Sequence, residues 1–250
     1  MTTDLQHFSA FQAARLAEWR PGRADDAVPH GEIFASAHEC AGAAMALALA
    51  VDRMRARKPD PLADMSDERA WLWVQDDVAL KLTGRPYHPG LPQNLRRRLV
   101  HVAAKSPQDA LFALEEGLRC RELAFVIGEI AGNPRALDFT ASRRLSLAVE
   151  KHGVPLWLVR LDAEADLSSA RMRWRTRSAV SPLPRWNRQA PGTASWQAEL
   201  FRARNHPPGE WILRDDGHVL AARRSSCAPG EPENSGDLVP AAGDRPLAAH

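Results

Sequence analysis

The 250-residue sequence predicts an α/β fold in which helices sandwich a mainly parallel sheet that continues into an antiparallel C-terminal extension. Short apolar runs alternate with helical segments along the first two thirds of the chain, as is typical of parallel strands buried on both faces. After residue 170 the strand-like segments follow one another without intervening helices, which favours antiparallel pairing.

The helices can be placed from apolar periodicity and from the residues at their ends. We expect them at residues 4–19, 43–55, 106–119 and 140–152. The third has the clearest boundary, because Ser106 can cap it, Pro107 suits its first turn and Asp109 complements the helix dipole. Gly153 closes the fourth helix.

The strands follow from short apolar runs bounded by turn residues. Five are expected between the helices, at residues 32–37, 71–74, 99–103, 123–127 and 155–161. Three more, at 171–180, 196–204 and 210–214, make up the antiparallel extension. The chain therefore divides into an N-terminal helix and linker (1–28), a core (29–224) and a tail (225–250) that lacks the apolar residues needed to fold.

Composition excludes several classes of protein. The 33 basic and 31 acidic side chains give a net charge of +2, so overall charge does not indicate a nucleic-acid or membrane ligand. The three cysteines form neither a CxxC pair nor a disulfide framework. The N-terminus is unlike a signal peptide, and the longest apolar stretch, 41–51, is shorter than the ~20 residues of a membrane span. We therefore expect a cytoplasmic protein.

The order of segments resembles a RecA core. The resemblance is carried by PHGEIFASAHECAGAAMALALAVDRM, WLWVQDD, LRRRLVHVAAKSPQDALFALEEGLR, LAFVIGE and TASRRLSLAVEKHGVPLWLVR. These segments are similar, in order, to the phosphate-loop strand and helix, the strand before the catalytic carboxylate, a strand–helix unit, the metal-binding Walker B strand and the nucleotide-sensing strand. The resemblance implies a RecA-like core at residues 29–224.

Further phrases resemble the ImuA family, which is related to SulA and RecA. They are WVQD, GRPYHPGL, ALEEGLRC, LDFTASRRLSLAVEKHGVP and GEWIL. The resemblance implies an accessory role in SOS-induced, error-prone translesion DNA synthesis. It also implies work beside ImuB, a homologue of Y-family polymerases, and an error-prone DNA polymerase, with RecA and DNA as further candidate partners.

The residues that hydrolyse ATP in RecA-like proteins are missing from this pattern. A phosphate loop needs a Lys for the phosphates and a Ser or Thr for the metal, but these positions fall on Ala44 and Met45. Gly128 stands where the Walker B Asp would be, with Glu129 beside it. Asp76 or Asp77 keeps the position of the catalytic acid, although a solvated acidic turn explains them as well.

We therefore expect a non-enzymatic protein with no catalytic residue, cofactor or metal site. A RecA-like, DNA-dependent ATPase with an atypical phosphate loop is one alternative. A simple DNA-binding module is another.

Two sets of arginines are candidates for binding DNA or a partner. Arg171, Arg173, Arg175 and Arg177 alternate with other residues, so on a strand they share one face while Trp174 points to the core. Such a face can bind a DNA backbone or an acidic partner, or it can be an ordinary solvated surface. Arg202 and Arg204 lie in a segment that resembles the RecA region whose basic residues reach a neighbouring subunit; two exposed strand arginines are the simpler alternative.

Overall fold

The computed structural model describes Pro21 and residues 29–56, 67–184, 187–216 and 220–225. Its strands are β1 (His30–Ala35), β2 (Ala70–Gln75), β3 (Leu99–Ala103), β4 (Leu123–Ala131), β5 (Leu156–Leu161), β6 (Met172–Ser178), β7 (Ser195–Ala203), β8 (Gly209–Asp215) and β9 (Leu220–Arg224). Its helices are α2 (Ala41–Ala56), α3 (Asp77–Thr83), η1 (His88–Gly90), α4 (Gln93–Arg96), α5 (Pro107–Arg119) and α6 (Phe139–His152). The predicted helix 4–19, most of the linker after α2 and the tail from residue 226 lie outside the described residues.

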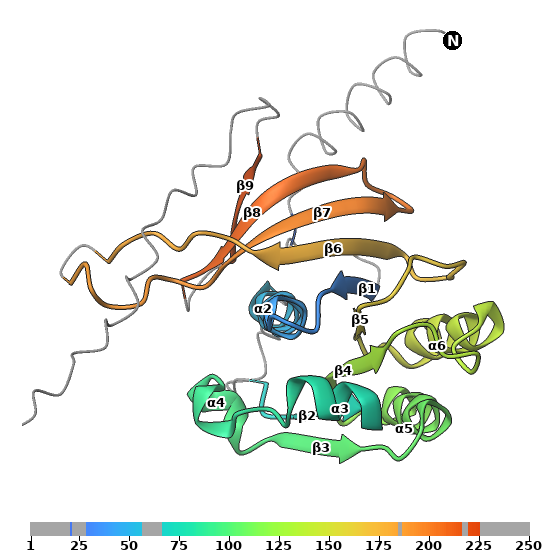
Figure 1. Cartoon of the computed structure of the whole chain (residues 1–250). Helices are drawn as coiled ribbons and strands as arrows, with labels where there is room; N and C mark the ends of the chain where they lie inside the picture. The colour runs from blue at the N-terminus through green and yellow to red at the C-terminus, as the bar shows by residue number, and fades with distance from the viewer. Residues whose placement is uncertain (1–20, 22–28, 57–66, 185–186, 217–219, 226–250) are drawn as a thin grey trace, which may run out of the picture.

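The nine strands form a single sheet in the order β3-β2-β4-β5-β1-β6-β7-β8-β9. The pairs from β3 to β6 are parallel, and the pairs from β6 to β9 are antiparallel. Figure 1 shows the antiparallel strands together on the β1 side of the parallel ones. The predicted α/β fold, with a mainly parallel sheet and an antiparallel extension, is confirmed.

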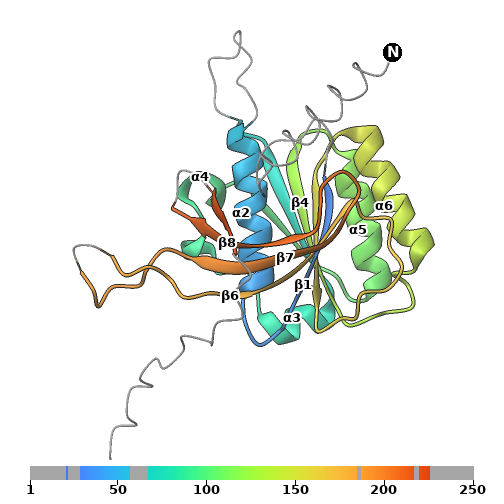
Figure 2. The same ribbon diagram turned by 90° about the horizontal axis from the view of Figure 1, so that it is seen from above.

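Helices cover both faces of the parallel strands. Helix α2 packs on β5, β4 and β6, whereas α5 and α6 pack against each other on the opposite face. Figure 2 shows this arrangement from above, with α2 on one side of the strands and α5 and α6 on the other. Two apolar clusters fill the interior, one on each face, and the α2 side holds the buried tryptophans of β2, β5, β6, β7 and β8.

Local end signals placed α5 and α6 correctly. The Ser106 hydroxyl accepts a hydrogen bond from the Asp109 N–H at 3.1 Å, and Gly153 ends α6 in the left-handed conformation. Helix α3 and strand β9 were not predicted, and β4 continues four residues beyond the predicted end at Ile127. Among the described residues, no helix combines the length and apolar character that crossing a membrane requires.

Candidate functional site

The first region to consider is the connection between β1 and α2, where a RecA-like protein would hold phosphate. Two carboxylates lie at this connection: Glu39 belongs to it, and Asp162 contacts it from just after β5. Asp162 accepts a hydrogen bond from the Ala37 N–H at 3.1 Å, and Glu39 accepts one from the Ser178 N–H at 2.9 Å. The carboxylates make the connection electrostatically unsuited to a triphosphate, since like charges repel.

The start of α2 is packed for contact with the sheet. A Cβ on Gly42 would lie 2.7 Å from the Cβ of Ala35 and 2.8 Å from Cγ1 of Val159, so only glycine allows this close approach. Met45 is fully buried, and Ala44 packs against the same apolar cluster. The residues at the predicted phosphate- and metal-contacting positions therefore belong to the core.

Asp76, at the end of β2, is completely buried and caps α3 by accepting the Ala79 N–H at 2.7 Å. Burial is the main cause of its raised pKa. The alternative of a solvated acidic turn is therefore wrong for Asp76. Asp77 is more open and pairs with Lys81 at 3.0 Å along the same helix.

Glu129, near the end of β4, is also buried, and burial raises its pKa. It accepts hydrogen bonds from Trp73 Nε1 at 2.8 Å, from the Gln75 amide at 3.2 Å and from the Thr83 hydroxyl at 3.1 Å. Gly128 carries no side chain into the adjoining apolar cluster, where a Cβ would lie within 3.1 Å of Leu158 and Leu114. The acid next to the Walker B position is thus enclosed by internal hydrogen bonds.

The four alternating arginines of the predicted strand 171–180 have different surroundings. Arg173 is buried, and its Nε lies 2.7 Å from Oε2 of Glu32. The expectation of a common solvated face is therefore wrong for Arg173. Arg175 is exposed and pairs with Glu199 on β7 at 3.2 Å, and Arg177, also exposed, donates to Gln197 at 2.9 Å.

Burial of Arg173 depends on a neighbouring strand. Glu32 lies opposite Arg173 in the parallel β1–β6 register, and its other carboxylate oxygen accepts the Ser168 hydroxyl at 2.6 Å. The guanidinium carbon of Arg173 also lies 5.1 Å from the ring centre of Phe34 and 5.4 Å from that of Phe201. Arg173 therefore has a structural role inside the protein.

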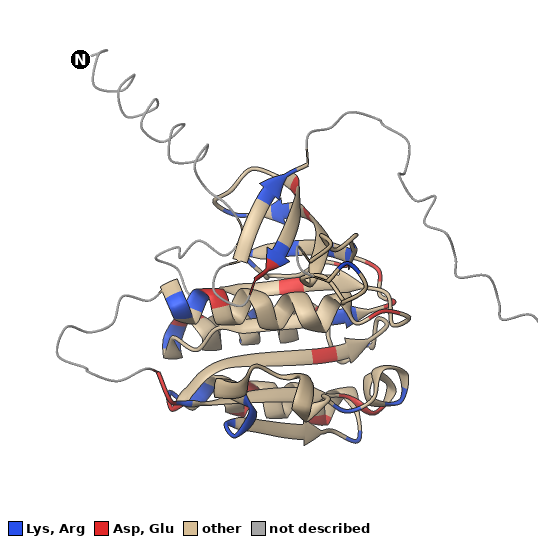
Figure 3. Cartoon of the chain, turned by 90° about the vertical axis from the view of Figure 1, so that its left-hand side faces the viewer, with Lys and Arg blue, Asp and Glu red and all other residues tan. Residues whose placement is uncertain are grey.

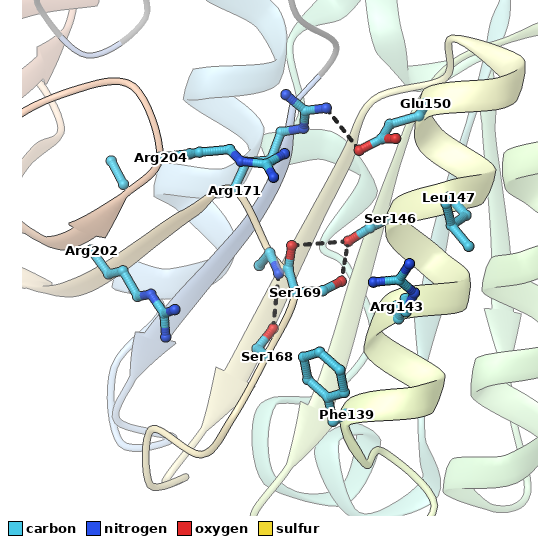
Figure 4. Close-up of a pocket in the computed structure, with 12 residues that line it drawn as sticks. Phe139, Arg143, Ser146, Leu147, Glu150, Ser168, Ser169, Arg171, Arg202 and Arg204 are labelled. Atoms are coloured by element: carbon cyan, nitrogen blue, oxygen red, sulfur yellow. Dashed lines mark hydrogen bonds and ion pairs between the residues drawn. The ribbon is translucent and has the colours of Figure 1, made fainter.

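The structure brings Arg171, Arg202 and Arg204 together in a cavity of about 450 Å³, which we call the arginine pocket (Figure 4). Arg171 reaches it from the start of β6, and Arg202 and Arg204 reach it from the end of β7 and just beyond. Arg143, from α6, completes the set. The remaining walls are formed by Phe139, Ser146, Leu147, Glu150, Ser168, Ser169, Ala170 and Ala203.

The arginines of the pocket differ in how they are paired. Arg171 contacts Glu150 at 2.7 Å. The side chains of Arg143, Arg202 and Arg204 are exposed and make no hydrogen bond or ion pair with any described residue. Figure 4 shows Arg143 and Arg202 approaching the serines from opposite walls. Elsewhere, Figure 3 shows basic and acidic residues interspersed over the elements that face the viewer.

Arg143 was not predicted as a site residue. It lies three, four and seven residues before Ser146, Leu147 and Glu150, so all four occupy one face of α6. That spacing can be read from the sequence. What cannot be read from it is that this helix face lies opposite the end of β7.

A buried polar layer forms the floor of the pocket. The Ser146 hydroxyl contacts His30 Nδ1 at 2.7 Å and donates to the carbonyl of Ser169 at 3.1 Å. Burial lowers the pKa of His30 to about 4, so this ring is neutral near pH 7. The first of these contacts joins α6 to β1, and the second joins α6 to the segment before β6. Both therefore hold the α6 wall of the pocket in place. Among the described residues, no three His, Cys, Asp or Glu side chains are grouped as metal ligands.

The sequence is similar to two curated proteins, both named Protein ImuA, from the Caulobacter vibrioides strains NA1000/CB15N and ATCC 19089/CIP 103742/CB 15. Each is 35% identical to the chain over 133 residues, which cover 48% of this chain and 52% of the relative. The chain thus spans about half the length of the curated relatives it matches. No family profile matches it. The similarity confirms the predicted resemblance to the ImuA family.

Proposed function

As a relative of the ImuA proteins, this chain is, we propose, a non-catalytic accessory protein of SOS-induced, error-prone translesion DNA synthesis. It acts with an ImuB-like Y-family polymerase homologue and an error-prone DNA polymerase, and RecA is a further candidate partner. The similarity to the proteins named ImuA is the observation that carries this proposal.

The proposed core is RecA-like. Support comes from the position of β1 inside the sheet, between β5 and β6, with α2 following it directly. Support also comes from the switch to antiparallel pairing after β6, in agreement with the antiparallel extension predicted for residues 171–214. The degenerate nucleotide site would then lie at the carboxyl ends of β1, β2 and β4. The antiparallel strands would extend the sheet beside β6.

The proposed absence of catalysis is supported by the contacts at the carboxyl ends of the parallel strands. An ATPase needs a cationic phosphate loop and an acid free to orient water. Here Glu39 lies within the β1–α2 connection, Asp162 contacts it, and Asp76 is used as a buried helix cap. These contacts support a chain that does not hydrolyse ATP, with Asp77 as the acid that remains partly exposed.

The alternative of a simple DNA-binding module depended on four arginines along one exposed strand. Arg173 is buried against Glu32, and Arg175 is paired with Glu199. A continuous basic track for a phosphate backbone is thus interrupted on β6. We therefore favour partner binding over autonomous DNA binding.

ATP binding and turnover test the non-catalytic part of the proposal. Calorimetry with ATP and Mg²⁺ should show no micromolar binding, and phosphate release should stay at the background rate with or without DNA. Micromolar affinity, together with turnover that disappears in Asp76→Ala or Asp77→Ala, would replace the proposal with an ATPase. Parallel denaturation curves show whether each variant is folded.

Association with an ImuB-like protein tests the accessory part. Co-expression of the full chain with an ImuB-like protein should yield a complex that survives affinity capture and gel filtration. Capture of the polymerase should depend on the presence of both proteins. If the full chain and the ImuB-like protein elute separately at micromolar concentration, the accessory role is wrong as stated.

A further inference from the structure

We propose that the arginine pocket binds a short acidic peptide segment of a partner protein. Carboxylates of the segment contact Arg143, Arg202 and Arg204, and an apolar side chain beside them packs on Phe139 and Leu147. The choice of a protein as occupant rests on the proposed accessory function. The existence of an anion site rests on the geometry of the pocket.

Uncompensated positive charge points to an anionic ligand. Arg143, Arg202 and Arg204 are exposed, line one cavity and have no acidic partner within the described part of the chain. The planar guanidinium group presents several N–H donors in a fork that matches the two oxygens of a carboxylate. Three such groups converging from two walls therefore favour a ligand with more than one carboxylate.

A carboxylate already occupies part of the pocket. Glu150 contacts Arg171 at 2.7 Å, and on the side of α6 that faces α5 Arg144 contacts Glu115 at 2.9 Å. Glu150 also reduces the net charge at one end of the pocket. The incoming carboxylates would then be directed to the other end, toward Arg143 and Arg202.

The surroundings favour a peptide over a nucleic-acid backbone. Phe139 and Leu147 are 47% and 50% exposed on the α6 wall and offer an apolar surface beside the arginines. The crossover segment that leads into the pocket carries Asp162, Glu164 and Asp166 just before Ser168. These acids would repel a phosphate chain that continued past the pocket, whereas a short peptide ends before reaching them.

The pocket is formed before any ligand binds. The hydroxyl of Ser168 is held by Glu32, and the backbone N–H of Arg204 donates to the carbonyl of Arg171 at 3.0 Å. The first contact anchors the crossover segment, and the second joins the two strand ends that carry the arginines. Little ordering entropy is then lost on binding, which favours affinity for a short segment.

Fluorescence anisotropy with the full chain tests the proposal directly. The probe is a fluorescein-labelled peptide in which glutamates flank a Leu-Phe pair, and the reference probe has glutamine in place of each glutamate. The glutamate peptide should bind, and the double variant Arg202→Ala, Arg204→Ala should weaken binding about tenfold or more. Leu147→Ser should also weaken binding, and added salt should weaken binding by the wild type more than by the arginine variant.

The matched control is the double variant Arg175→Ala, Arg177→Ala. It removes two exposed arginines from the same sheet at a distance from the pocket, so affinity for the peptide should stay within about twofold of wild type. Denaturation curves establish that all variants remain folded.

Several results would overturn the proposal. They are equal binding of the two peptides, equal losses in the pocket and control variants, or no binding by the wild type. Displacement of the peptide by a single-stranded oligonucleotide of higher affinity would assign the pocket to nucleic acid. Binding that emerges only after Glu231→Gln, Glu233→Gln and Asp237→Asn would assign it to the chain's own tail. Because no ImuB-like protein is present, failure here is distinguishable from failure of the accessory role.

Discussion

The ionisable residues at the carboxyl ends of the parallel strands differ from those of the arginine pocket in burial and in bonding. At the strand ends, Asp76 and Glu129 are buried and their oxygens accept hydrogen bonds from neighbouring groups. In the pocket, Arg202 and Arg204 are exposed, and their side chains contact no acid among the described residues. The first region uses its charges to hold elements of the fold together, and the second leaves them available to a ligand.

The carboxyl ends of the parallel strands are where the proposed RecA-like core would hold a nucleotide. Polar groups buried at these strand ends need partners within the protein, because an unpaired buried polar group is costly. Asp76 finds its partner as the cap of α3, and Glu129 finds its partners in hydrogen bonds from Trp73 and Thr83. The exposed arginines lie elsewhere, in the pocket between α6 and the end of β7.

The largest loss of stability is expected when the buried Arg173 is replaced by a residue of opposite charge. Arg173→Glu would place a second carboxylate beside buried Glu32, and stability should fall by about 3–5 kcal/mol. Arg202→Glu, on the exposed side of the comparison, should change stability by only about 0.5 kcal/mol. Urea denaturation of both variants measures the difference.

If Arg173→Glu does not fold, Arg173→Met provides the same comparison with a milder change. It removes the cation but keeps much of the volume, so Glu32 remains buried without its partner. Equal midpoints for the position 173 and position 202 variants would contradict the distinction between the two kinds of arginine.

A pH effect should come from the layer beneath the pocket. The pKa of His30 is about 4 in the folded chain, against 6.5 for an ordinary histidine, so the unfolded chain takes up the proton first. Stability should therefore be fully present above pH 6.5 and decline as the pH falls to 4, by roughly 3 kcal/mol. Comparison of denaturation curves at several pH values with those of His30→Gln isolates this contribution, since glutamine does not titrate. The same slope in both proteins would contradict it.

Gly42 distinguishes a packing glycine from a phosphate-loop glycine. A methyl group there would lie 2.7 Å from Ala35, so Gly42→Ala should destabilise the protein by about 1–3 kcal/mol without any nucleotide present. Gly31→Ala is the matched control, because its nearest contact would be an ordinary 3.5 Å to Trp157. Thermal unfolding should distinguish the two variants. An unchanged midpoint for Gly42→Ala would show that the close packing of α2 does not require glycine at this position.

The smallest effect is expected on the outer part of β6. Arg175 and Glu199 are both exposed, and surface pairs of this kind contribute about 0–1 kcal/mol. Arg175→Ala should therefore leave the denaturation midpoint nearly unchanged. A loss comparable to that of the Arg173 variants would show that the boundary between buried and exposed arginines on β6 lies further along the strand.

Local signals in the sequence determined the α/β class and the main elements. Capping by Ser106, the left-handed closure at Gly153 and the alternation of apolar runs with helices act over a few residues. Such signals keep the same meaning in any context, because they satisfy backbone groups and bury apolar surface locally. Helix α3 was missed because it is only seven residues long and follows a strand directly.

Tertiary structure alone decided which arginines are free. Glu32 precedes Arg173 by more than a hundred positions, and only the parallel pairing of β1 with β6 places the two side chains together. In the same way, Arg143 joins Arg202 because α6 packs beside the strand ends. The pattern of a single strand shows which side chains share a face. Whether acidic partners neutralise the charges on that face depends on segments that are distant in the sequence. Their charge state as a group is therefore a property of the assembled fold.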